Sequence, residues 1–136
     1  MTVQLNHTIV AAHDRHASAH FLADLLGLQV GPEYGPFVPV EIPGGVTLDF
    51  ADADASGPVT PQHYAFLVSE SDFDAIFARL RAAGLTYWAD PYHRRPGEIN
   101  RNDGGRGTYF DDPSGHRLEI LTKPYGSGGS GGSGGS

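Results

Sequence analysis

The chain has 136 residues, of which 9 are Lys or Arg, 16 are Asp or Glu and none is Cys, and its formal charge is −7 at pH 7. This acidic balance argues against nucleic acid or an anionic membrane as a partner. The lack of cysteine excludes thiolate catalysis, zinc fingers and disulfide frameworks, and no apolar run reaches the ~18 residues of a membrane span. We therefore expect a soluble, cytoplasmic protein that binds a small molecule.

The C-terminal end differs in composition from the rest. Residues 126–136 read GSGGSGGSGGS, which is typical of a flexible linker or tag. The remaining residues 1–125 predict a single domain that is large enough to fold without disulfides or a structural metal. We expect two modules within it, at about 1–56 and 60–125. A metal ion in this domain would therefore serve function.

The first module predicts one helix among strands. Strands are expected over residues 3–11, 37–42 and 46–51. Apolar residues recur on one helical face at Phe21, Leu22, Leu25 and Leu26. Asp14 or Ser18 could cap this helix, and Gly27 is placed to end it.

The second module repeats this order. Strands are expected over residues 63–69, 85–89, 107–111 and 117–122. Its helix is indicated by Phe73, Ile76, Phe77 and Leu80, with Gly84 as the stop. Asp112–Gly115 (DPSG) predicts a tight turn between the last two strands.

Matching residues support a duplication. Asn6-His7 matches Gln62-His63, Gly27 matches Gly84, and Leu48-Asp49-Phe50 matches Leu118-Glu119-Ile120. The order βαβββ, read twice, predicts an α+β fold whose two modules form a curved mixed sheet. The second module is longer by an inserted polar stretch, 91–106, which we interpret as a loop over a pocket.

Four ligand-type side chains occupy duplicated strand positions. The two-residue period of a strand puts His7, Asp49, His63 and Glu119 on faces that point away from the helices. A buried carboxylate needs a cation or strong donors nearby. We predict a divalent metal on His7, His63 and Glu119, with Asp49 as a candidate fourth ligand. Such donors suit Fe(II), Mn(II), Ni(II), Co(II) or Zn(II).

Each of several other polar residues can be interpreted as either structural or functional. A single strand histidine is more often structural than a ligand, and the spacing of His13, His16 and His20 fits a solvated helix surface as well as a metal clip. Tyr109 lies two residues before the turn, where its hydroxyl could share the face of Glu119 or pack in the core. Loop arginines could attract an anionic substrate or stay solvated: Arg94, Arg95 and Arg106.

The segments LNHTIV, PQHYAFLV and YFDDPSGHRLEIL resemble the metal-binding strands of the vicinal-oxygen-chelate superfamily, which includes glyoxalases, bleomycin-resistance proteins and extradiol dioxygenases. The last segment resembles the signature of extradiol ring-cleaving dioxygenases. That resemblance implies a two-module fold around Fe(II), which would chelate an aromatic or anionic substrate, with Tyr109 donating a hydrogen bond. Arg101 and Thr108 stand where an acid/base histidine is expected. Arg101 could stabilise an anion but could not act as a base.

The same resemblance leaves other functions open. A glyoxalase-type lyase or isomerase would use four ligands, at His7, Asp49, His63 and Glu119. A drug- or metabolite-binding protein without turnover would use an aromatic cleft, for which Phe37, Tyr87, Trp88 and Tyr92 are candidates. A homodimer that shares its sites between chains is a further expectation. The departures at Arg101 and Thr108, with the regular tail, also fit a deliberately altered enzyme.

Overall fold

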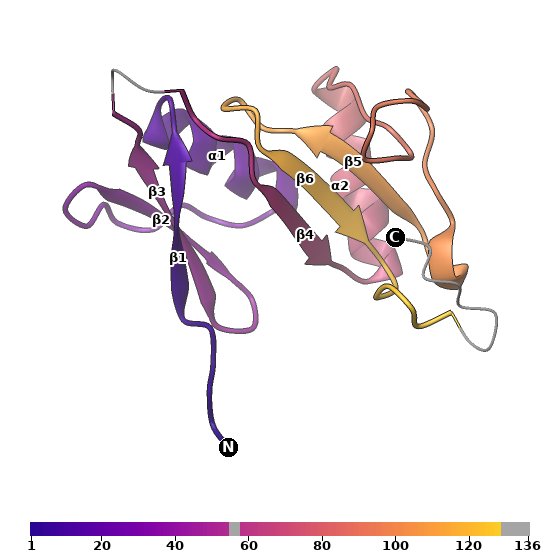
Figure 1. Ribbon diagram of the computed structural model, residues 1–136, viewed down its shortest axis with the longest axis horizontal. Helices are drawn as coiled ribbons and strands as arrows, with labels where there is room; N and C mark the ends of the chain where they lie inside the picture. Colours follow the sequence, from indigo (N-terminus) through magenta and orange to yellow (C-terminus); the bar gives the residue numbers. More distant parts are fainter. Residues whose placement is uncertain (55–57, 129–136) are drawn as a thin grey trace. The chain divides into compact units, whose positions relative to one another are not determined.

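The computed structural model describes residues 1–54 and 58–128. Its elements are β1 (His7–Ala12), α1 (Arg15–Leu26), β2 (Phe37–Ile42), β3 (Val46–Asp52), β4 (His63–Leu67), α2 (Glu70–Ala82), the short 3-10 helix η1 (Asn102–Gly104), β5 (Gly107–Asp111) and β6 (Arg117–Leu121) (Figure 1). The α+β class is confirmed. Most of the predicted linker, and the last residues of the predicted first module, lie outside the described residues.

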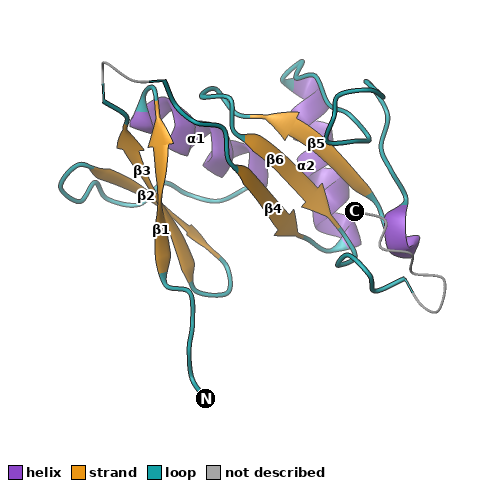
Figure 2. Cartoon of the chain, in the orientation of Figure 1, coloured by secondary structure: helices purple, strands orange, loops and turns teal. Residues whose placement is uncertain are grey.

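The chain divides into two compact units. The first unit comprises residues 1–61 together with the turn 112–115, and the second comprises residues 62–111 and the chain from His116 on. Each unit has its own sheet and helix (Figure 2). The predicted mixed sheet is thus present as two three-stranded sheets, one in each unit.

The first sheet has the order β1-β3-β2, in which β3 runs parallel to β1 and antiparallel to β2. Strand residues on one face are buried together with the apolar face of α1, and these form the core of the unit: Val10, Val38, Val40, Leu48, Phe50, Leu22 and Leu25. The other face carries His7 and Asp49 and remains partly exposed.

Helix α1 begins and ends at residues that the sequence marks. The Asp14 carboxylate accepts hydrogen bonds from the backbone N–H groups of His16 (3.0 Å) and Ala17 (3.1 Å). Gly27 ends the helix in the left-handed region, at φ 75°. Ser18, the alternative cap, is buried instead, and its hydroxyl is 3.1 Å from that of Ser114.

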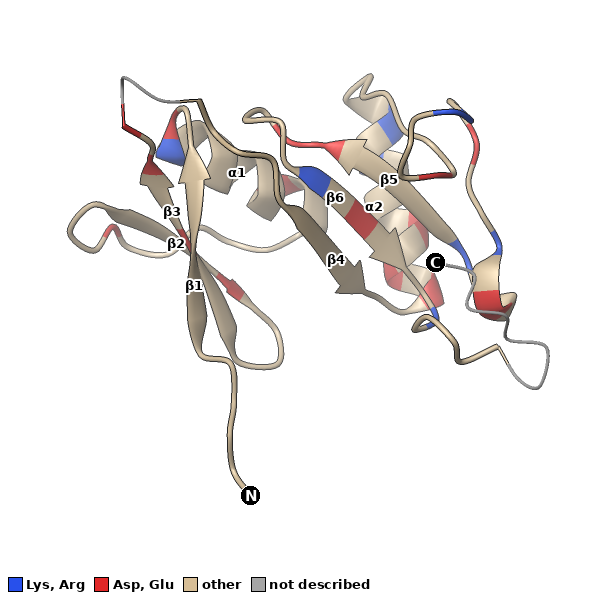
Figure 3. Ribbon diagram, in the orientation of Figure 1, with Lys and Arg blue, Asp and Glu red and all other residues tan. Residues whose placement is uncertain are grey.

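The second sheet repeats this topology. Its order is β4-β6-β5, with β6 parallel to β4 and antiparallel to β5. Helix α2 lies behind the sheet in Figure 1 and buries Phe73, Ile76 and Leu80. Figure 3 shows acidic residues at one end of α2 and basic residues at the other, which favours the helix through its dipole. Of the helices in residues 1–54 and 58–128, none is long and apolar enough to cross a membrane.

The strand registers support the duplication. In the first sheet Ile9 is paired with Asp49, two residues after His7. In the second sheet Ala65 is paired with Glu119, two residues after His63. The two histidine and carboxylate positions therefore correspond in the sheets as they do in the sequence.

The predicted strand 85–89 is wrong in its extent. The N–H of Leu85 still donates to the Leu80 carbonyl at the end of α2 (3.2 Å). Trp88 exchanges both backbone hydrogen bonds with Tyr109, at 2.9 and 2.8 Å, and Ala89 then turns away to donate to Arg95. A helix terminus on one side and a turn on the other leave only isolated bridges at Trp88, one to Tyr109 and one to Pro96.

We expect Asp14→Ala to lower the free energy of unfolding by about 1 kcal/mol, because two backbone N–H groups of α1 lose their acceptor. Urea unfolding followed by circular dichroism measures this change. Asp24→Ala, at an exposed position of the same helix, is the control and should be near neutral. An equal loss in both variants would show that the cap contributes nothing special.

Arg106, which directly precedes β5, binds α2 through hydrogen bonds and ion pairs. Its guanidinium donates to Glu70 Oε1 and to Asp74 Oδ1, both at 2.8 Å, and lies 4.4 Å from the centroid of the Phe73 ring. Hydrogen bonds from the Thr122 hydroxyl and from Arg106 hold the pKa of Glu70 below its ordinary value. A depressed carboxyl pKa stabilises the fold above the unfolded pKa, and this stabilisation is lost as pH falls through the folded value.

Glu70→Gln should therefore be less stable than the parent chain above about pH 4.3, the ordinary pKa of a glutamate. The difference should shrink as the pH falls through the lower pKa of the folded state. Urea midpoints between pH 3 and 7 test this, with the exposed Asp24→Asn as control. A gap for Glu70→Gln that stays constant down to pH 3 would contradict the ionic role of Glu70.

Candidate functional site

Glu119 is the most unusual polar residue of the second unit. It lies on β6, the central strand, and its side chain is on the face opposite to α2, as the alternation with Leu118 and Ile120 predicts. Only 1% of its surface is exposed. Among the described residues it forms no ion pair with Lys or Arg, and its only salt-bridge partner is His63. A carboxylate buried this deeply needs other compensation.

His63 lies beside this carboxylate. Its Nε2 is 3.1 Å from Glu119 Oε1, and its Nδ1 is 3.1 Å from the backbone carbonyl of Arg117. A carbonyl can only accept, so Nδ1 must carry the proton and donate it. In a neutral imidazole, Nε2 is then an acceptor that faces a second acceptor, the carboxylate oxygen.

Two acceptors at this distance repel unless a proton or a cation lies between them. Ligands of a divalent metal at about 2.1 Å and at right angles would be about 3 Å apart. A ligand histidine also commonly donates its other N–H to a carbonyl, as His63 does to Arg117. The donor set and its spacing therefore fit a divalent metal. In residues 1–54 and 58–128, however, no three His, Cys, Asp or Glu side chains form a ligand group.

Two phenols complete the surroundings of Glu119. The Tyr125 hydroxyl donates to the carboxylate of Glu119 and is 3.0 Å from the hydroxyl of Tyr109. Because the single Tyr125 proton goes to Glu119, Tyr109 must donate to Tyr125. Burial, followed by the hydrogen bond to Glu119, raises the pKa of Tyr125, and burial also raises the pKa of Tyr109. Both phenols therefore stay protonated donors at neutral pH.

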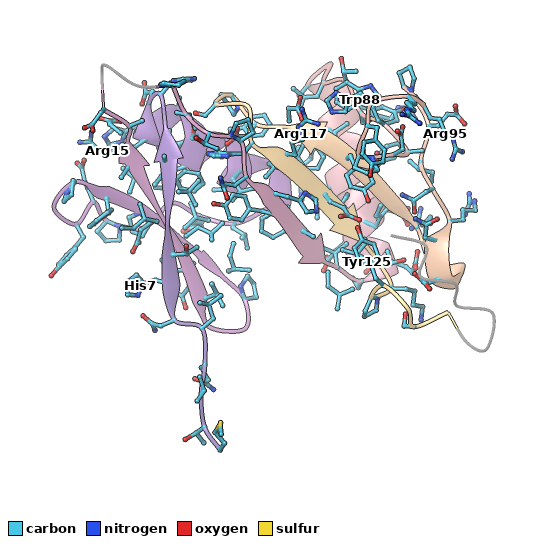
Figure 4. The ribbon with its side chains drawn as sticks, viewed as in Figure 1. His7, Arg15, Trp88, Arg95, Arg117 and Tyr125 are labelled. Atoms are coloured by element: carbon cyan, nitrogen blue, oxygen red, sulfur yellow. The ribbon has the colours of Figure 1, made fainter. Side chains whose placement is uncertain are left out.

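A cavity of about 440 Å³ opens beside this group. We call it the His63 pocket, and it is lined by His63, Pro91, Tyr92, His93, Tyr109, Asp111, Arg117 and Tyr125. Its size is that of a site for a small molecule, and its lining is mostly aromatic. Figure 4 shows Arg117 near the start of β6 and Tyr125 past the end of that strand. Arg117 is the only Lys or Arg among the described residues that line the pocket.

The corresponding residues of the first unit are arranged more loosely. His7 is exposed at the start of β1 (Figure 4), and its Nδ1 is 2.7 Å from Asn6 Oδ1. With Nδ1 donating to this oxygen, Nε2 is left as an acceptor, as it is in His63. Asp49 is half-buried on β3. The structure thus brings Glu119, His63 and Tyr109 together, whereas His7 and Asp49 are described within the first unit.

Other residues singled out by the sequence lie elsewhere in the second unit. Arg101 is exposed at the start of η1 and is not among the pocket residues. Thr108 is fully buried on the face toward α2, and its hydroxyl donates to the Trp88 carbonyl (3.0 Å). A histidine at either position would not reach the His63 pocket through this geometry. Arg106 is held by α2, as described above.

The aromatic residues that the sequence suggested for a cleft lie in different places. Tyr92 lines the pocket, and Trp88 stacks on His93, whereas Tyr87 packs edge-on against Phe77. The first residues of the predicted loop 91–106 therefore do border a pocket. The three helix histidines lie on α1, where His16 is 3.4 Å from Glu33.

Four polar residues of the pocket were not singled out from the sequence: His93, Asp111, Arg117 and Tyr125. Tyr125 directly precedes the Gly/Ser repeat, outside any periodic segment. His93 belongs to the inserted polar stretch 91–106, in which the sequence indicated arginines and Tyr92 as candidates for substrate contact. The one available signal was the position of His93 in a polar insertion that was predicted to cover a pocket.

Comparisons with known proteins agree with this architecture. The model of the Glyoxalase/Bleomycin resistance protein/Dioxygenase superfamily matches residues 4–120. The solved structure of oxidase ChaP-H2 is 78% identical, with a TM-score of 0.91, over 95% of this chain and 100% of that one. Oxidase ChaP-H1 is 64% identical, with a TM-score of 0.88, over 92% of this chain and 99% of that one.

A curated relative is more distant. Glutathione transferase FosA of Serratia marcescens is 33% identical over 125 residues, which is 88% of this chain and 81% of that protein. The family match, which covers most of the chain, and the repeated β-α-β-β units lead to the same conclusion. This chain belongs to the Glyoxalase/Bleomycin resistance protein/Dioxygenase superfamily, the vicinal-oxygen-chelate proteins.

Proposed function

We propose that this chain is a divalent-metal-dependent oxidase or dioxygenase that acts on a small hydroxylated aromatic molecule in the His63 pocket. The observation that carries the proposal is the contact between His63 Nε2 and Glu119 Oε1, which lie 3.1 Å apart at the edge of an aromatic cavity while His63 Nδ1 contacts the Arg117 carbonyl. Fe(II) is the favoured metal, because two histidines and one carboxylate are the usual ligands of oxygen-activating non-haem iron.

His63 and Glu119 would hold the ion, with His7 as the third ligand. The ring of His7 supports this assignment, since its Nδ1 has a local acceptor and its Nε2 is available, as in His63. Asp49 corresponds in register to Glu119 and is the candidate fourth ligand. Its side chain is one methylene shorter, which favours a role through water or as an acceptor for a ligand histidine.

The bound ion would supply a Lewis acid for two adjacent substrate oxygens and, as Fe(II), the capacity to react with O2. The chain's own residues would orient the substrate. Tyr109 and Tyr125 offer phenolic donors beside Glu119, and aromatic walls suit a planar ring. Arg117, whose guanidinium donates to the Pro91 carbonyl (3.3 Å), can also face an anionic substituent.

The relatives support oxidation over group transfer. Those named oxidases are 64% and 78% identical, whereas the relative named a transferase is 33% identical. A glyoxalase-type lyase or isomerase is the second candidate, because Asp49 and Glu119 occupy equivalent registers and could both serve as ligands.

The metal site can be tested without knowledge of the substrate. Anaerobic titration of the apoprotein with Fe(II), or with Co(II) followed by its visible absorption, should show one bound ion per chain. His63→Ala and Glu119→Gln should each weaken binding by at least ~100-fold, since loss of only an outer partner already costs about 10–100-fold. His20→Ala, on the exposed surface of α1, should leave it unchanged. Equal binding by His63→Ala would refute the assignment.

The origin of the His7 ligand can be tested by mixing variants. His7→Ala and Glu119→Gln are unfolded together and refolded as an equimolar mixture. If His7 reaches the His63 pocket of a second chain, random pairing restores roughly a quarter of the sites. If it serves its own chain, metal content stays at the level of the single variants. Full binding by His7→Ala alone would remove His7 from the ligand set.

Oxygen uptake tests the reaction class. The Fe(II)-loaded chain should consume O2 with catechol as the probe substrate, and Tyr109→Phe should lower kcat/KM roughly 2- to 10-fold, the effect of losing the neutral hydrogen bond to the Tyr125 hydroxyl beside Glu119. Tyr34→Phe, at an exposed site in the first unit, serves as control. Metal binding without O2 uptake, together with turnover of a hemithioacetal, would replace the oxidase with the lyase.

A further inference from the structure

His93 has an unusual environment in the wall of the His63 pocket. Its backbone lies in the left-handed region at φ 60°, which side chains other than glycine rarely adopt. Its ring stacks on Trp88, with centroids 3.6 Å apart and planes within 7° of parallel. Strained backbone conformations persist where the surrounding structure imposes them, and they gather at functional sites. The position of this imidazole is thus maintained against the local preference of the chain.

Asp111 faces the same ring from β5. Its Oδ1 is 3.6 Å from His93 Nε2, close enough for charge attraction but too long for a hydrogen bond. This oxygen is buried, and it has no hydrogen-bond partner in residues 1–54 and 58–128. Both side chains line the cavity. A buried acceptor beside an imidazole can stabilise the imidazolium ion once the ring takes up a proton.

The geometry points to His93 as the residue that takes a proton from a substrate hydroxyl in the His63 pocket, with Asp111 and Trp88 as its positioning residues; this inference rests on the proposed function. In the step, the O–H bond of the substrate breaks and its electron pair stays on oxygen. An N–H bond forms on the imidazole, and the Asp111 carboxylate neutralises the resulting charge. The imidazolium returns the proton to the product or to water.

This assignment supplies the proton acceptor that neither Arg101 nor Thr108 can provide. Thr108 faces α2, and Arg101 does not border the pocket. Other charged and titratable groups line the same cavity and affect a charge on His93: Asp111 and Tyr109 from β5, Arg117 from β6, His63 from β4, and Tyr92 and Tyr125 from the loops. Asp111 favours the imidazolium, and Arg117 opposes it.

The ionisation of 4-nitrocatechol provides a test that does not require turnover. The full chain, loaded with Fe(II) without oxygen, is mixed with this probe in a stopped-flow spectrometer, and formation of the bound, deprotonated probe is followed by absorbance between pH 5.5 and 8. Loss of a general base typically slows proton transfer 100-fold or more. His93→Gly should slow the ionisation phase by about that factor, while probe affinity changes less than about threefold.

Glycine is the suitable replacement because it adopts a φ of 60° without strain, so this variant should fold. It also leaves space beside Trp88, and added imidazole should restore the ionisation rate. Asp111→Asn keeps the shape but removes the charge, so its rate profile should be displaced along the pH axis. His20→Gln, on α1, is the surface control and should match the parent chain.

The outcomes separate the two proposals. An unchanged ionisation rate in His93→Gly, or a slow rate that imidazole does not restore, overturns the role of His93 and leaves the metal-dependent function standing. If the parent chain binds Fe(II) but not the probe, or binds no Fe(II), both proposals fall. Slow ionisation with rescue by imidazole, and a displaced pH profile for Asp111→Asn, support His93 as the proton acceptor.

Discussion

Glu119 holds a carboxylate on the central strand of its sheet, on the face that α2 does not cover, and yet almost none of it reaches solvent. A buried negative charge is costly, so its neighbours must compensate for it. The sheet provides them from both sides, with His63 on β4 and Tyr109 on β5 at or next to its register. Tyr125, which follows β6, donates a further hydrogen bond to the carboxylate. Several side chains of the pocket therefore offset the free-energy cost of burying the Glu119 carboxylate.

The two units have diverged around this constraint. Pro39 is paired with Asp49 where Tyr109 is paired with Glu119, so the first sheet lacks the phenol that the second provides. Asp49 is also less buried than Glu119. A shorter, partly hydrated carboxylate needs less compensation and can therefore do without such neighbours. Among the described residues, the phenol paired with the central carboxylate belongs to the second unit, where the His63 pocket lies.

Much of this arrangement follows from the sequence by simple periodicity. The alternation of strand residues predicted that His63 and Glu119 share a face, and the registers confirm it. The sequence also predicted that Gly27 and Gly84 end the two helices, and both glycines, which follow the helices, have positive φ. Tyr125 and His93 were not predicted as pocket residues, because their positions depend on loop geometry: one follows the last strand, and the other has a positive φ. The predicted strand 85–89 was wrong in its extent because within it only Trp88 forms bridges, to Tyr109 and to Pro96, and a helix end and a turn interrupt the strand on either side.

The position of Tyr125 has a practical consequence. This residue touches Glu119 through its hydroxyl and stands directly before Gly126, where the glycine-serine repeat begins. Any cargo or solid support attached through the repeat is thus joined to the chain one residue away from a contact of the central carboxylate. Because Tyr125 also lines the His63 pocket, displacing this residue would change the pocket wall. Immobilised preparations of this protein should accordingly be anchored elsewhere, for example through the exposed surface of α1.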